Sequence, residues 1–180
     1  MAAGTLVSLE EYLALPESKT GREYDKGRVI ELSAPSQLHA DVQMNVGYAF
    51  KAFLLTSGLG IGLRGPTGYW LTPEVERVPD VSLVRLTKLA ALEVFHGSVR
   101  GAPDVAIEII SPNEHAGELE REVEQYLAAG VLAVILIYPD SQHVHVHRPR
   151  GEARRLGTGD TLEIPELLPG FKLAIDEIFR

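Results

Sequence analysis

One segment, residues 104–138, restricts the fold more than any other part of the chain. Its sequence, DVAIEIISPNEHAGELEREVEQYLAAGVLAVILIY, reads as a strand, a turn, a helix and a second strand. Alternate residues of the first strand point to opposite faces, and both faces are apolar apart from Glu108. Such a strand is typical of the centre of a sheet that is covered on both sides. The segment therefore predicts a central strand buried between two layers.

Glu108 is the exception in this apolar strand. A buried carboxylate costs several kcal/mol to desolvate unless it is paired, protonated or bound to a metal ion. We therefore take Glu108 as a candidate functional carboxylate, with a buried structural ion pair as the alternative.

The helix that follows carries a second carboxylate of interest. Ser111-Pro112-Asn113-Glu114 fits a capping box with Pro at the first helical position, although Gly117 would let the regular helix begin later. At about 100° per residue, Glu122 flanks the apolar stripe of this helix, whereas Arg121 points roughly opposite it. The stripe consists of Leu119, Val123, Tyr126, Leu127 and Gly130. Glu122 therefore either faces the same space as Glu108 or is a solvated flank residue.

The rest of the chain predicts short elements around this unit. We expect a helix from the Ser8 capping box to Leu15, a hairpin that turns at Lys26-Gly27, and a helix from about Leu38 to Leu55. Strand candidates are residues 61–63, 68–71 and 78–84, and helix candidates are residues 86–95 and a last turn from Ile175. No repeat, low-complexity tract or linker divides residues 1–180, which predicts a single domain.

The charge and composition limit the class of protein. A net charge of −8 argues against nonspecific nucleic-acid binding through overall charge, but it leaves room for a local basic groove. The absence of cysteine excludes disulfides and thiolate metal sites. The chain begins without a signal peptide pattern, and no apolar run approaches the ~20 residues of a membrane span. We therefore expect a cytoplasmic protein with no membrane partner.

Asp80 and Glu108 form a candidate acid pair. Asp80 begins a predicted interior strand, and the spacing to Glu108 allows the two strands to be neighbours. Two carboxylates that converge from adjacent strands suit hard cations such as Mg²⁺ or Mn²⁺, which polarise a phosphate and activate water. The alternative is that Asp80 is an ordinary turn residue at a strand start.

The histidines allow separate interpretations. His143, His145 and His147 share one face of a strand, where they could bind a transition metal or form the wet face of an outer strand. His39 lies near a helix N-terminus and is a candidate site residue or a capping or interface residue. No phosphate-binding glycine loop and no G-x-S-x-G nucleophile motif is present.

Several segments together carry a resemblance that spans nearly the whole chain. They are SLEEYLALPE, REYDKGRVIELSAPSQLH, VPDVSLV, PDVAIEIISPN, EQYLAAGV with the following IYPD, and LLPGF. In these segments the chain resembles the bacterial Uma family of predicted restriction endonucleases, which have the PD-(D/E)xK nuclease fold. The resemblance implies an α/β (α+β) protein with a restriction-endonuclease-like core. In that core a small mixed β-sheet lies between helices, with an extra N-terminal hairpin. It also suggests a homodimer.

The resemblance also assigns roles to individual residues. It implies that Asp80 and Glu108 bind the metal ion, Mg²⁺ or Mn²⁺, and that Glu23 and His39 lie near the site. The Lys expected two residues after the second acid is Ile110 here.

In the family this Lys is displaced onto the following helix, at the position of Glu122. Glu122 is thus a departure from the family pattern, and Arg121 points the wrong way to substitute for the Lys. A Lys would stabilise developing negative charge on phosphate, whereas Glu repels phosphate and could strengthen metal binding.

Three hypotheses follow for function. The first is a Mg²⁺- or Mn²⁺-dependent endonuclease acting on DNA phosphodiesters, in which Glu122 is either an extra metal ligand or the mark of a lost activity. Its candidate DNA contacts are Arg22, Lys26, Arg64, Arg85 and Lys88. The second is a catalytically degenerate nuclease fold that serves as a binding or assembly module. The third is a metal protein built on the three neighbouring histidines.

Overall fold

The computed structural model describes residues 6–112 and 114–180, and its main feature is a mixed six-stranded sheet. Its strands run in the order β12-β11-β10-β9-β6-β3, and we call it the central sheet. Only β9 and β10 pair in parallel; the other neighbours are antiparallel. The strands are β3 (Ile61–Arg64), β6 (Val81–Arg85), β9 (Val105–Ile109), β10 (Ala133–Tyr138), β11 (His143–His147) and β12 (Ala153–Leu156).

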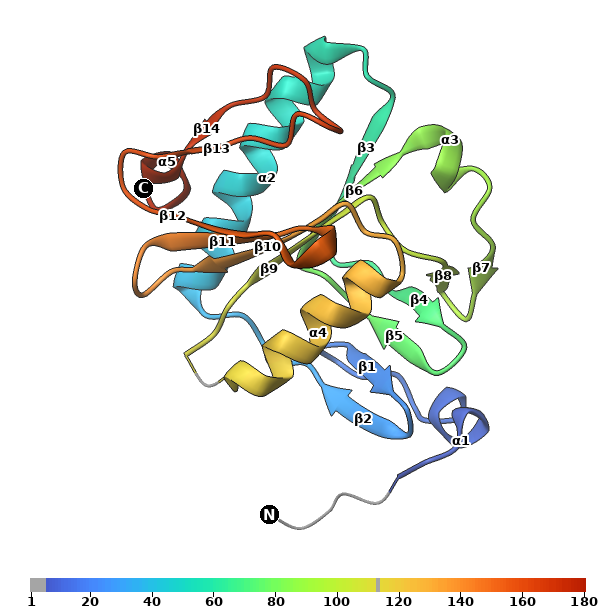
Figure 1. Cartoon of the computed structure of the whole chain (residues 1–180). Helices are drawn as coiled ribbons and strands as arrows, with labels where there is room; N and C mark the ends of the chain where they lie inside the picture. The colour runs from blue at the N-terminus through green and yellow to red at the C-terminus, as the bar shows by residue number, and fades with distance from the viewer. Residues whose placement is uncertain (1–5, 113) are drawn as a thin grey trace.

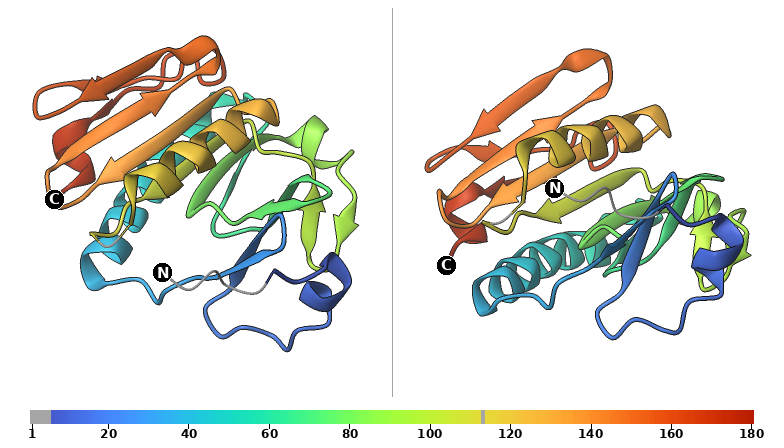
Figure 2. Two further views of the ribbon diagram at one scale, coloured as in Figure 1. Left: turned by 60° about the horizontal axis from the view of Figure 1, so that its bottom comes forward. Right: turned by 90° about the horizontal axis from the view of Figure 1, so that it is seen from below.

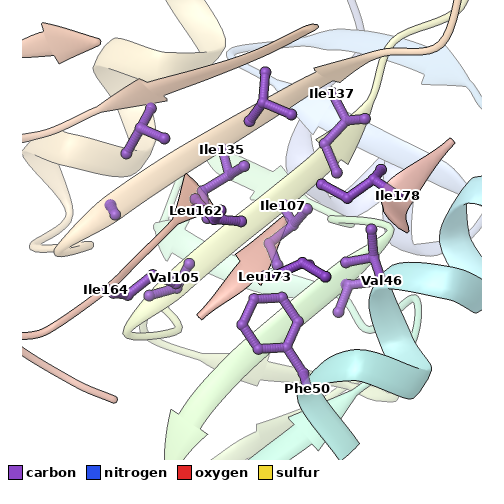
Figure 3. Packing of buried hydrophobic residues seen from close by; sticks show 14 of the residues in the cluster. Val46, Phe50, Val105, Ile107, Ile135, Ile137, Leu162, Ile164, Leu173 and Ile178 are labelled. Atoms are coloured by element: carbon purple, nitrogen blue, oxygen red, sulfur yellow. The ribbon is translucent and has the colours of Figure 1, made fainter. Parts of the chain in front are cut away.

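Two helices cover opposite faces of the central sheet (Figure 1). On one face, α2 (Gln37–Ser57) packs Val46 and Phe50 against β9 and β10, together with the C-terminal segment (Figure 3). On the other face lies α4 (Ala116–Ala128). The C-terminal segment adds β13 (Thr161–Leu162), β14 (Leu173–Ala174) and α5 (Ile175–Ile178), after the 3₁₀ turn Pro149–Gly151.

The alternation of β9 explains why it can separate two cores. Val105, Ile107 and Ile109 contact the core on the α2 side, whereas Ala106 and Ile110 contact the core under α4. These side chains are at most 8% exposed, so the predicted central strand covered on both faces is confirmed.

A second six-stranded sheet holds the N-terminal hairpin, in the order β2-β1-β5-β4-β8-β7. Its strands are β1 (Arg22–Asp25), β2 (Arg28–Glu31), β4 (Tyr69–Thr72), β5 (Val75–Arg77), β7 (Val94–Phe95) and β8 (Ser98–Arg100). The short helix α1 (Leu9–Leu13) packs Tyr12 against Tyr24 and Trp70 of this sheet. Figure 2 shows this part of the protein beside the central sheet and its helices.

Several local predictions are confirmed and two are wrong. The Ser8 capping box, the Lys26-Gly27 hairpin and the long helix α2 are present. The expected helix over residues 86–95 is limited to α3 (Leu86–Leu89), since Val94 and Phe95 form a strand. The predicted capping box at Ser111 does not begin α4, because the helix starts at Ala116. The Glu114 carboxylate accepts a hydrogen bond from the Ser111 N–H. Asn113, which belongs to the same predicted box, lies outside the described residues. No helix in the described part of the chain is both long and apolar enough to span a membrane.

Candidate functional site

Asp80 and Glu108 meet at the edge between β6 and β9. Val81 pairs with Ile107 in antiparallel register, so the next position in that register sets Asp80 opposite Glu108. The Asp80 N–H donates a hydrogen bond to Glu108 Oε2 at 3.3 Å. The structure thus brings the two predicted acids together on adjacent strands.

The carboxylate of Asp80 is held from two sides. His39 Nε2 lies 3.0 Å from Asp80 Oδ1, and the Ile109 N–H donates to Asp80 Oδ2 at 2.8 Å. Both His39 and Gln43 project from α2, and Gln43 Nε2 donates to the Asp80 carbonyl at 2.8 Å. The hydrogen bond to Asp80 raises the pKa of His39 above its usual 6.5, although partial burial acts in the opposite direction. Helix α2 therefore fixes Asp80 as well as covering the sheet.

Glu108 is buried and hydrogen-bonded from α4. The Tyr126 hydroxyl donates to Glu108 Oε1 at 2.8 Å. Burial raises the pKa of Glu108 well above 4.5, and the negative charges of Glu122, Asp80 and Glu23 raise it further. The Tyr126 hydrogen bond acts in the other direction but is the smaller influence. The sequence placed Tyr126 only on the apolar stripe of the helix, and its hydroxyl contact was not anticipated.

Glu122 faces the acid pair, one helical turn before Tyr126. Burial raises the pKa of the Glu122 carboxyl from 4.5 to about 8, and the charge of Glu23 adds to this. The positive charge of Arg77 and a hydrogen bond with Glu108 lower it in part. Because this pKa lies above 7, the Glu122 carboxyl is mostly protonated at neutral pH. Glu122 thus faces the same space as Glu108, while part of its side chain stays accessible to solvent.

Glu23 lies behind this group, bound to a buried arginine. Its Oε1 accepts the Val78 N–H at 2.8 Å, and its Oε2 accepts from Arg77. It makes no hydrogen bond to Asp80 or Glu108 among the described residues, and it acts on Glu108 through its charge.

Arg77 is the residue that the sequence analysis missed. Its side chain is 4% exposed and contacts Glu23, Asp25 and Gln125. Gln125 in turn donates to Asp25 Oδ1 at 2.9 Å, which joins α4 to the hairpin. Arg77 lies on β5, a strand of only three residues within what read as a loop, but the polar pair Glu76-Arg77 next to an apolar Val was an available signal.

The other predicted residues lie away from the acid pair or are paired internally. His145 and His147 line a groove of about 710 Å³ between α4 and β11. The ring centroids of His143 and His145 are 4.8 Å apart, and those of His145 and His147 are 6.1 Å apart. Within residues 6–112 and 114–180, no three His, Asp or Glu side chains are gathered to hold a metal ion.

Of the proposed DNA contacts, three form ion pairs within the protein: Arg22 with Glu31, and Arg85 and Lys88 with Asp104.

Comparisons with known proteins identify the family and the fold of this chain. A sequence model of a family described as Uma2, "Putative restriction endonuclease", matches residues 9–176. A crystal structure of "a putative nuclease belonging to DUF820" from Anabaena variabilis superposes with a TM-score of 0.82 at 24% identity, over 96% of this chain and 97% of that one. A DrdV–DNA complex matches at a TM-score of 0.39 and 15% identity, over 79% of this chain and 14% of that one, which does not establish a shared fold. No curated protein matches the sequence. Because the family model covers nearly the whole chain, this protein belongs to the Uma2 family.

Proposed function

We propose that the protein is a metal-dependent nuclease that hydrolyses DNA phosphodiesters, with Asp80 and Glu108 as the ligands of a Mg²⁺ or Mn²⁺ ion. The observation that carries the proposal is the meeting of these two carboxylates across β6 and β9. The membership of the Uma2 family and the nuclease-like fold support it.

The donor set at this position fits a hard divalent cation. Mg²⁺ usually keeps several waters and is bound through one or two carboxylates plus substrate phosphates, so the absence of a third gathered ligand in the described residues does not conflict with it. The pKa of Glu108 is raised by burial and by surrounding negative charge, and a cation would relieve both costs. A bound cation would polarise a phosphate oxygen and offset its charge.

The protein's own groups would orient these ligands. His39 holds one oxygen of Asp80, and Tyr126 holds one oxygen of Glu108. Such outer contacts fix the direction in which a carboxylate presents its free lone pairs. His39 and Tyr126 therefore act as positioning residues in this proposal.

Glu122 favours a second candidate, a degenerate nuclease fold that binds without cleaving. The Glu122 carboxyl stands at the position where the family resemblance implies a Lys. Arg77, whose positive charge lowers the pKa of Glu122, already forms ion pairs with Glu23 and Asp25. Arg77 is thus not free at this point to stabilise charge developing on a phosphate.

Mn²⁺ titration calorimetry and plasmid nicking would test the proposal together. We expect the wild type to bind Mn²⁺ and to nick supercoiled DNA only with Mg²⁺ or Mn²⁺, and Asp80→Asn to lose both. Asp140→Asn, which removes an exposed carboxylate elsewhere, is the matched control and should change neither. Metal binding without cleavage by the wild type, together with cleavage by Glu122→Lys, would favour the degenerate module. Nicking that survives in Asp80→Asn would refute the assignment of the site.

A further inference from the structure

A groove of about 710 Å³ opens between α4 and the strands β10 and β11 of the central sheet. It lies on another side of α4 than the acid pair, because Glu120 and Glu124 line the groove, whereas Glu122 faces the acid pair. Residues two apart on a helix point roughly 200° apart, so one helix can serve both places. The volume falls within the range of about 300–1,000 Å³ that small-molecule sites occupy. The groove takes no part in the proposed nuclease reaction.

The floor of the groove is apolar and continues the core under α4. Leu119, Val123 and Leu136 are buried members of that core, and all three line the groove. Leu127 and Tyr138 pack against the same core and are only half-buried where they reach the groove. An apolar group placed on this floor would therefore remove further apolar surface from water.

The wall on the β11 side is made of imidazole rings. His145 pairs with Leu136 across β10 and β11, which sets its ring on the same face of the sheet as the floor. Its ring centroid lies 5.0 Å from that of Tyr138. Burial lowers the pKa of His145 and His147 below the usual 6.5, and neighbouring charges such as that of Arg155 lower the pKa of His145 further. Both rings are therefore neutral at neutral pH and do not repel a cation.

These two rings also have unused hydrogen-bonding capacity. The Nε2 atoms of His145 and His147 are buried and have no hydrogen-bond partner among the residues that the structure describes. Buried polar atoms are usually paired, so an unpaired nitrogen in each of two neighbouring rings calls for an explanation. A wall of this kind suits a ligand that brings an N–H donor.

The rim of the groove is acidic. Five carboxylates line it, and none of them forms an ion pair with a cation that the structure describes. They are Glu114, Glu120, Glu124, Asp140 and Glu152. Arg148 also lines the groove, but its guanidinium pairs with Glu166 and donates to the Glu163 carbonyl at 3.3 Å. The groove therefore attracts positive charge and repels anions such as the phosphates of DNA.

We propose that this groove binds a small organic cation with an apolar body, such as an arylalkyl ammonium ion. The apolar body would lie on the floor, and the ammonium group would lie among the carboxylates of the rim. An inorganic cation would gain nothing from the floor, and an anion would be repelled by the rim. The inference does not depend on whether the acid pair cleaves DNA.

An NMR titration of the histidine ring protons with phenethylamine tests the site. We expect the signals of His145 and His147 to shift on binding. The signals of His39, which contacts Asp80, and of His96, at the turn between β7 and β8, should stay in place. Phenethyl alcohol has the same body without the charge and should bind roughly tenfold more weakly, because it lacks the attraction of the carboxylates. Hydrocinnamate, which carries a negative charge on a similar body, should not bind.

Matched variants assign the binding to the rim and to the floor. Glu120→Gln combined with Glu124→Gln should weaken phenethylamine roughly tenfold and leave the affinity for the alcohol unchanged. Glu10→Gln combined with Glu118→Gln removes the same charge from exposed carboxylates outside the groove and should change neither affinity. Leu127→Ala should weaken the amine and the alcohol by the same factor, because both lose the same apolar contact.

Several results would overturn the proposal. Phenethylamine that shifts neither His145 nor His147 would do so, as would equal affinities for the amine and the alcohol. An equal loss of amine binding in the two double variants would show an effect of net charge rather than a site. Zn²⁺ or poly-lysine that shifts these signals when phenethylamine does not would assign the groove to a metal ion or to a basic protein partner instead.

Discussion

The strongest test of the site's electrostatics is the replacement of Glu122 by Gln. The pKa of Glu122 is raised from 4.5 to about 8, mainly by burial, so the folded protein keeps a proton that the unfolded chain releases above about pH 4.5. Between these two values the unfolded state binds fewer protons than the folded state. Stability therefore falls as the pH rises through this range, and the loss is complete above about pH 8.

The size of the effect follows from the difference between the pKa of Glu122 in the unfolded chain and in the folded protein. One pKa unit corresponds to about 1.4 kcal/mol, so this difference lowers the free energy of unfolding by at most about 5 kcal/mol. Glu122 is only partly buried, and solvent screens part of this cost. We therefore expect Glu122→Gln to stabilise the protein by about 2–3 kcal/mol above pH 8, or about 5–10 °C in Tm.

Urea and thermal unfolding at about pH 5 and about pH 8.5 would measure this gain. The gain should be large at the higher pH and near zero at the lower one. Glu124→Gln, which removes an exposed carboxylate from the same helix, is the control and should change stability little at either pH. The reasoning would be refuted if Glu122→Gln destabilised the protein at high pH, which would mean that an ion pair with Arg77 outweighs the cost of burial.

The other predictions concern the groups that hold the site. Arg77→Met should cost about 3–5 kcal/mol in urea unfolding, because it leaves Glu23 buried without its partner. Arg28→Met, which breaks an exposed ion pair, should cost less than about 1 kcal/mol, and equal costs would contradict the argument. In an NMR titration, Asp80→Asn should bring the raised pKa of His39 back toward 6.5. In the wild type, the contact between His39 and Asp80 stabilises the fold below pH 6.5, and this stabilisation is lost as the pH rises through the raised pKa of His39. If His39 had the same pKa in Asp80→Asn as in the wild type, the contact would be excluded.

The central sheet could be predicted from the sequence because its signals are local. The alternation around Glu108 indicated two buried faces, and both exist. The spacing of Asp80 and Glu108 only allowed neighbouring strands; the register that sets them opposite each other comes from the folded sheet. Spacing made the two acids a candidate pair, and the family resemblance implied that both bind the metal ion.

The second sheet was harder to predict because its strands are short. The turn at Lys26-Gly27 was recognised, but an equivalent turn at His96-Gly97 was not, although both residues of each pair have positive φ and open a hairpin. Residues 86–95 were expected to form a short helix followed by a loop, whereas the helix ends at Leu89 and Val94 and Phe95 form β7. Arg77 was missed for a related reason, since its importance arises from contacts with Asp25 and Gln125, which lie far away in sequence.

The buried position of Arg77 also limits how this protein can evolve. A single change of Glu122 to Lys would introduce the residue that the family resemblance implies at this position. It would also set a second cation beside a guanidinium that already satisfies Glu23 and Asp25. A Lys at position 122 and the guanidinium of Arg77 would repel each other in a poorly solvated place. Positions 77 and 122 should therefore change together in a lineage, and the benefit of either substitution should depend on which residue the other position already holds.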